Sequence, residues 1–97
     1  MIAMTWTIQF LPDAAKELRG LDRQDAARII KTLEKRIASR EDPRSVGAPL
    51  KGEHAGYWRW RIGHYRVVAR IVDDRVTILI VRVAHRKEVY QIGRAHV

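Results

Sequence analysis

The segment from residue 57 to residue 83 constrains the fold most, because three strand-like runs follow one another there with very short breaks. The runs are Tyr57–Ile62, Tyr65–Val72 and Arg75–Val83, each rich in β-branched, aromatic or other apolar residues as in a strand. The breaks, Gly63-His64 and Asp73-Asp74, each fit a two-residue hairpin loop. The sequence therefore predicts three consecutive antiparallel strands joined by tight turns.

Two-residue loops also predict which side chains share a face of this sheet. Trp60 should lie opposite Val67, and Ala69 opposite Ile78, because side chains alternate between faces along a strand. One face then collects only apolar or aromatic side chains, namely Trp58, Trp60, Ile62, Tyr65, Val67, Ala69, Ile71, Val76, Ile78 and Ile80. We expect this face to be the core.

The opposite face is predicted to carry four arginines, Arg59, Arg61, Arg66 and Arg70, over an aliphatic floor that includes Val81 and Val83. Continued alternation would bring His85 to the same side. Arg61 should face Arg66 directly, and like charges in such positions destabilise a sheet. Guanidinium groups bind phosphate oxygens bidentately, so the cluster predicts an anion-binding surface. Alternatively, these arginines bind no ligand: their charged groups extend into solvent, or they form ion pairs with Glu53 or Glu88.

The first half of the chain predicts the packing elements. Residues 4–10 alternate as a strand, and Pro12 is placed to begin a helix that stops at Gly20. A second helix, capped by Asp22, has apolar residues at helical spacing as far as Ile37 and should end before Asp42-Pro43. The predicted fold is α+β: a two-helix hairpin packed on one face of an antiparallel sheet of about four strands, with a short C-terminal tail. Residues 1–97 should form a single domain.

Charge gives the first indication of function. The chain carries 19 Lys+Arg against 11 Asp+Glu, and residues 51–97 alone hold ten basic and four acidic side chains. Such a field attracts polyanions. The chain has no cysteine and no apolar run long enough to span a bilayer, so we expect a cytoplasmic protein without a membrane partner. Four scattered histidines do not have metal-ligand spacing, and no metal or other cofactor is expected.

Three motifs, taken together, resemble the RelE/ParE toxin superfamily of type II toxin–antitoxin systems. They are Pro49-Leu50-Lys51-Gly52, the run Tyr57–Val68 (YWRWRIGHYRVV), and His85-Arg86-Lys87-Glu88-Val89-Tyr90. The resemblance covers about Thr5 to Tyr90 and favours the RelE branch. It implies an endoribonuclease that cuts messenger RNA on the ribosome without a metal ion and so inhibits translation. It also implies a cognate antitoxin as partner.

The resemblance assigns roles to individual residues. The proposed catalytic residues are Arg66 at the scissile phosphate, Arg86 at the leaving group, Tyr90 against the messenger base, and His85. The proposed RNA-binding residues are Lys51, Arg59, Arg61 and Arg70.

The sequence departs from the RelE pattern at Tyr57 and Arg59, where RelE has lysines and one of them is favoured as the general base. A guanidinium group is always protonated, so it is a poor base. His85 is then the better candidate for the general base. Alternatively, His85 has only a structural role at the end of the strand, where it bonds a backbone carbonyl. The departure leaves open a ParE-like toxin that inhibits DNA gyrase, and a non-catalytic member that only binds nucleic acid or a partner. Both Met1 and Met4 are candidate start residues.

Overall fold

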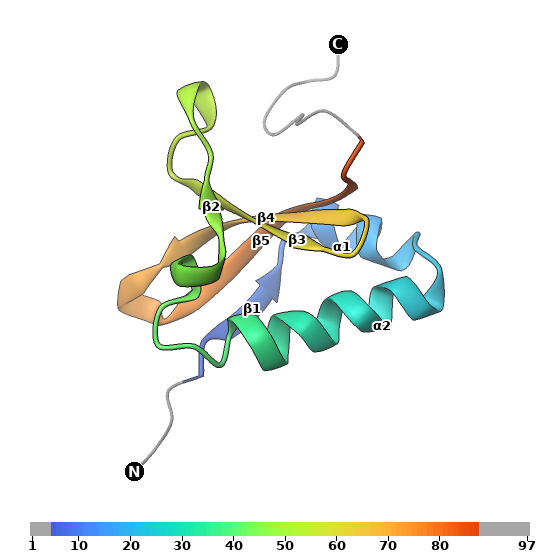
Figure 1. The fold of residues 1–97 in the computed structure, drawn as a ribbon, viewed down its shortest axis with the longest axis horizontal. Helices are drawn as coiled ribbons and strands as arrows, with labels where there is room; N and C mark the ends of the chain where they lie inside the picture. Colours follow the sequence, from blue (N-terminus) through green and yellow to red (C-terminus); the bar gives the residue numbers. More distant parts are fainter. Residues whose placement is uncertain (1–4, 88–97) are drawn as a thin grey trace.

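A computed structural model describes residues 5–87 and shows two helices packed on one face of a five-stranded sheet (Figure 1). The strands are β1 (Thr7–Phe10), β2 (Ala48–Pro49), β3 (Tyr57–Ile62), β4 (Tyr65–Val72) and β5 (Thr77–His85), in the spatial order β1-β5-β4-β3-β2. The predicted α+β class is confirmed. Two details differ: β2 is a short additional strand, and β1 pairs with β5 in parallel. Among residues 5–87, no helix combines the length and the apolar character needed to cross a bilayer.

The helix hairpin consists of α1 (Pro12–Arg19) and α2 (Arg23–Thr32), which continues into a π-helical turn over Leu33–Ile37. Proline begins α1 because its fixed φ suits the first helical turn, and Gly20 follows its end, as predicted. Asp22 occupies the N-cap position of α2, but its side chain makes no capping hydrogen bond. The helix ends at Ile37, before Asp42-Pro43 as predicted.

The core lies between the helix hairpin and the sheet. The helices contribute Ala14, Ile29, Leu33 and Ile37, and the sheet contributes Trp60, Ile62, Val67, Ala69, Ile78 and Ile80, all buried. The predicted apolar face is therefore the core face. The indole of Trp60 lies against Gly47, where an added Cβ would come within 2.8 Å of its Nε1 atom. Only glycine leaves room for this ring.

The β3–β4 hairpin has the predicted register. Arg61 pairs with Arg66, Trp60 with Val67, and Ile62 with Tyr65. Gly63 takes a φ of +61° in the two-residue turn, a conformation that favours glycine. The faces assigned to these two strands are confirmed.

The loop between β4 and β5 differs from the predicted two residues. It spans four residues, because a 3₁₀ turn covers Asp73–Arg75 and Val76 follows it in the left-handed region, with φ +47°. Ile71 therefore pairs with Ile78 rather than Val76. The shift is two residues, so Ile78 and Ile80 still face the core.

A β-bulge further along β5 reverses the faces of its last residues. Val68 pairs with Arg82 and Ala69 with Ile80, which leaves Val81 as the extra residue. Val83 therefore points into the core, where it is 3% exposed. The prediction that Val83 and His85 share the arginine face is wrong, because alternation was extended across the bulge.

Candidate nucleic-acid interface

The sheet surface turned away from the helices carries the predicted arginines, and we call Arg59, Arg61, Arg66 and Arg70 the basic face. The register puts Arg61 beside Arg66, Arg59 beside Val68, and Arg70 beside Tyr57. Val68 is 1% exposed, so the floor between the arginines is apolar. Arginines of both strands thus gather on one side of one hairpin.

Three carboxylates in the described part of the chain pair with arginines outside the basic face. Glu17 pairs with Arg82 at 2.7 Å, while Asp42 and Asp73 both pair with Arg44, at 3.2 and 2.7 Å. Within residues 5–87, none of the ion pairs involves Arg59, Arg61 or Arg70. Three guanidinium groups of the basic face therefore retain their capacity to bind phosphate oxygens.

The bulge adds a residue that sequence reasoning missed. Arg82 pairs with Val68, so the register places it on the side of the basic face, while Ala84 pairs with Arg66. The Nε atom of Arg82 donates to Glu17, and the other carboxylate oxygen of Glu17 accepts from the backbone N–H of Val83 at 2.8 Å. One carboxylate on α1 thus binds the two residues that directly follow the bulge. The only available signal was Arg82 itself, a charged residue in a run of apolar ones.

His85, the last residue of β5, pairs with Tyr65 on the helix side of the sheet. Its ring packs edge-on against Tyr65, with centroids 5.6 Å apart, and stacks on His64 at 6.1 Å. Its Nδ1 atom accepts a hydrogen bond from the backbone N–H of Lys87 at 3.2 Å. The backbone N–H of Lys87 thus helps to hold the ring of His85 at the end of the sheet.

Arg86 lies beside the β3–β4 turn, because its backbone N–H donates to the carbonyl of His64 at 2.7 Å. Its side chain is exposed. The structure thus brings Arg66, His85 and Arg86 to one end of the sheet, although His85 faces the opposite side from Arg66. Tyr90 lies outside the described residues.

Lys51 is not on the sheet. It precedes a 3₁₀ turn, Gly52–His54, in the loop between β2 and β3, and this loop stands away from the sheet in Figure 1. Its side chain is exposed. Lys51 can therefore reach a long ligand but is not part of the arginine cluster.

A hydrogen bond ties the hairpin that carries the arginines to the helices. The phenol of Tyr65 donates to the carboxylate of Asp25 on α2 at 2.9 Å. This bond, with a smaller contribution from burial, raises the pKa of Tyr65 above its ordinary value, because the carboxylate disfavours a phenolate beside it. The bond anchors the residue that precedes Arg66.

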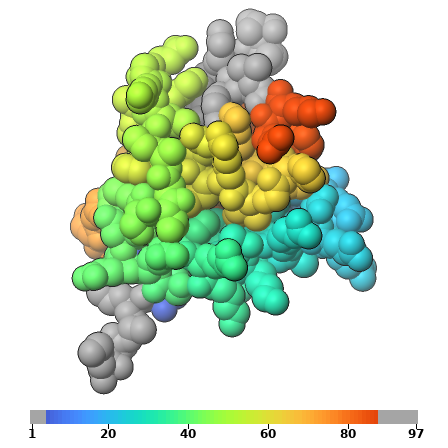
Figure 2. Space-filling view, in the orientation of Figure 1, coloured from blue at the N-terminus to red at the C-terminus, as the bar shows by residue number. Residues whose placement is uncertain are grey.

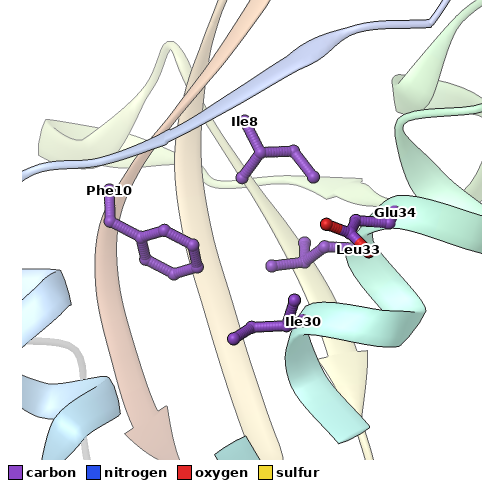
Figure 3. A pocket seen from close by; sticks show the side chains of 5 residues that line it. All are labelled: Ile8, Phe10, Ile30, Leu33 and Glu34. Atoms are coloured by element: carbon purple, nitrogen blue, oxygen red, sulfur yellow. The ribbon is translucent and has the colours of Figure 1, made fainter. Parts of the chain in front are cut away.

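An open pocket of about 130 Å³ lies between β1 and the second helix, on the helix side of the sheet and thus opposite the basic face. Figure 3 shows Ile8, Phe10, Ile30 and Leu33 around it, with the carboxylate of Glu34 at its margin. The single charge there has the wrong sign for phosphate. Residues 5–87 also contain no group of three His, Asp or Glu side chains that could share a metal ion.

Comparisons with known proteins agree with this architecture. A family model described as ParE toxin of type II toxin–antitoxin system, parDE, matches residues 8–90. The toxin RelG of Mycobacterium tuberculosis is 36% identical over 88 residues, which are 91% of this chain and 99% of that protein.

Solved structures give the same result. The toxin–antitoxin complex RelBE2 from M. tuberculosis matches with a TM-score of 0.79 and 31% identity, over 90% of this chain and 98% of that chain. A mutant of the E. coli toxin RelE in the free state matches with a TM-score of 0.68 and 23% identity, over 87% and 86%. The second likeness supports the fold alone. The chain belongs to the RelE/ParE superfamily of type II toxin–antitoxin toxins.

Proposed function

We propose that this toxin inhibits translation by cutting messenger RNA on the ribosome. The observation that carries the proposal is the basic face, where Arg61 lies directly opposite Arg66 and where Arg59, Arg61 and Arg70 have no carboxylate partner within residues 5–87. A phosphodiester backbone relieves the repulsion between such groups. The likeness to RelG and to the RelBE2 complex supports the RelE branch.

The proposed reaction uses the messenger's own 2′-hydroxyl as nucleophile. Its oxygen forms a bond to the adjacent phosphorus, the bond from phosphorus to the 5′-oxygen breaks, and a cyclic phosphate and a 5′-hydroxyl result. The hydroxyl proton goes to a base, and the leaving oxygen receives a proton. Arg66, with Arg61 beside it, would stabilise the additional negative charge on the phosphorane, and Arg86 would stabilise the leaving oxygen. Tyr90 is proposed to orient the messenger base.

His85 is the proposed titrating group for the proton transfer. To accept a proton at Nδ1, the ring must give up the hydrogen bond from the backbone N–H of Lys87, which costs free energy. Replacing His85 with Gln should therefore shift or remove the neutral-pH limb of the single-turnover rate profile. An unchanged profile would exclude His85 as the base.

A second function is favoured by two observations. The matching family model is that of ParE toxins, and Tyr57 and Arg59 stand where RelE has lysines. Inhibition of DNA gyrase by the same basic face is the corresponding proposal. A cognate antitoxin is proposed in either case, since the RelBE2 structure is a toxin–antitoxin complex.

Two assays on the purified wild-type protein separate these functions. On ribosomes programmed with a defined messenger, we expect cleavage within the decoding site, detected by primer extension. In a gyrase supercoiling assay, we expect no inhibition at the same concentration. Gyrase inhibition without messenger cleavage would contradict the proposal and support the ParE-like alternative.

A further inference from the structure

We propose that the toxin has a second phosphate-binding surface, which continues the basic face around the edge of β3 onto the helix hairpin and binds RNA backbone away from the bond that is cut. The surface is a hollow of about 190 Å³ that we call the edge hollow. It is lined by Thr32, Arg36, Ile37, Arg40, Val46, Trp60 and Arg61. The inference rests on the proposed function in taking RNA as the ligand.

The edge hollow exists because β2 is short. Within residues 5–87, β2 pairs only with Trp58 and Arg59, so the outer side of β3 from Trp60 to Ile62 carries no strand. The second half of the helix hairpin lies beside this open edge. Figure 2 shows the cyan-to-green helical segment directly against the yellow hairpin on this side of the molecule. Arg61 belongs both to the basic face and to the hollow, so it joins the two surfaces.

The charges lining the hollow all have one sign. Three arginines and Thr32 are among the residues that line it, and no Asp or Glu is. Arg40 is held in place, because its Nε donates to the backbone carbonyl of Arg36 at 2.8 Å, which uses one of its five N–H groups. Within residues 5–87, no carboxylate forms an ion pair with Arg36, Arg40 or Arg61. Nothing described there neutralises Arg36, Arg40 or Arg61.

Two basic residues lie on the same side of the helix as the hollow. Arg28, Thr32 and Arg36 follow at intervals of four residues, and Arg40 lies three residues beyond the end of the helix at Ile37. Arg28 reaches the β3–β4 turn, where its Nη1 would be 3.2 Å from a Cβ placed on Gly63. The eight-residue step from Arg28 to Arg36 spans roughly 12 Å of helix, which is long enough to follow more than one phosphate. A mononucleotide or a single anion would use only part of this length.

The test measures affinity for a single-stranded RNA oligonucleotide that carries 2′-O-methyl groups and so cannot be cut. Replacing Arg36 and Arg40 with Gln should weaken binding on the order of tenfold at about 0.1 M salt, and should reduce the slope of log affinity against log salt by about 1.4. The control replaces Arg19 and Arg75, two exposed arginines outside the hollow, with Gln and removes the same charge. The control should retain nearly the wild-type slope.

Replacing Arg36 and Arg40 with Lys keeps both positive charges and should retain the wild-type salt slope. This variant shows whether weaker binding of the glutamine variant comes from the lost charge or from damage to the fold. Equal slopes for the Arg36/Arg40 glutamine variant and the control would overturn the inference, as would a wild-type protein that does not bind the oligonucleotide. Because the oligonucleotide cannot be cut, the outcome is independent of catalysis. A protein that binds with this pattern but cuts no messenger would contradict the proposed function alone.

Discussion

Arg61 and Arg66 lie directly across from each other on β3 and β4. Like charges in opposed positions cost a sheet up to about 1 kcal/mol. The hairpin that carries this pair is tied to α2 by the hydrogen bond from Tyr65 to Asp25. A phosphate between two strands offsets such a cost, which is why the pair is the centre of the proposed site.

Tyr65 provides a prediction at the same scale. Its pKa is raised in the folded protein, so the bond to Asp25 contributes its full stability below about pH 10 and loses it as the pH rises through the folded pKa. Replacing Asp25 with Asn should lower the pKa of Tyr65 toward its ordinary value. The measurement is tyrosinate absorbance against pH, with the Tyr65→Phe protein subtracted to isolate this phenol. Equal midpoints with and without the carboxylate would show that the bond does not form in solution.

At the scale of elements, alternation predicted the β3–β4 hairpin but not the end of β5. Gly63-His64 is an ordinary two-residue turn between strands of clear period, so Arg61 and Arg66 could be paired from the sequence. From residue 76 to residue 81 every residue but Thr77 is strongly apolar, so the pattern does not mark which face each one takes. Neither the left-handed Val76 nor the bulge at Val81 has a glycine to signal it.

The bulge depends on a contact from a distant element, which local sequence cannot show. Glu17 on α1 accepts from the N–H of Val83 and from Arg82, and so satisfies the backbone group that the bulge displaces. The faces of His85 and Arg82 were missed for this reason. The parallel pairing of β1 with β5 is likewise a tertiary outcome, because β1 and β5 lie at opposite ends of the described chain.

The contact between Glu17 and the bulged end of β5 leads to a prediction for protein stability. Replacing Glu17 with Ala should lower the free energy of unfolding by about 1–3 kcal/mol, because a partly buried N–H loses its acceptor. Glu17→Gln keeps an amide oxygen for Val83 and should recover part of the loss. Urea denaturation measures both values, and hydrogen exchange at the Val83 amide shows whether the bulge opens. Slow exchange in the alanine variant would mean that Glu17 does not hold the bulge.

At the scale of the whole molecule, the two sides of the sheet have separate tasks. The helix side contains the buried core, and the other side carries the arginines. A net charge of +8 on 97 residues would oppose compaction if the charges were interleaved with the core. Their segregation follows from period-two alternation on β3 and β4, so this separation was predictable from the sequence. The edge hollow was not, since it depends on how α2 lies beside β3.

The core should therefore respond to substitution independently of the basic face. Trp60 is 2% exposed, and its Nε1 donates to the carbonyl of Pro43 at 3.1 Å. Trp60→Ala should lower the free energy of unfolding by about 3–5 kcal/mol in urea denaturation. The control is Trp58→Ala, at a half-buried ring, which should cost clearly less. Similar losses for the two would contradict the assignment of Trp60 to the centre of the core.

The most direct test of the account is the single-turnover rate of messenger cleavage on programmed ribosomes by the Arg66→Gln protein, with Arg19→Gln as the control. Loss of one charge-stabilising group should slow cleavage by about 10²–10³-fold, while the melting temperature stays near the wild-type value and Arg19→Gln cuts normally. Cleavage at the wild-type rate by a folded Arg66→Gln protein would contradict the claim that the basic face is the RNA-cutting surface.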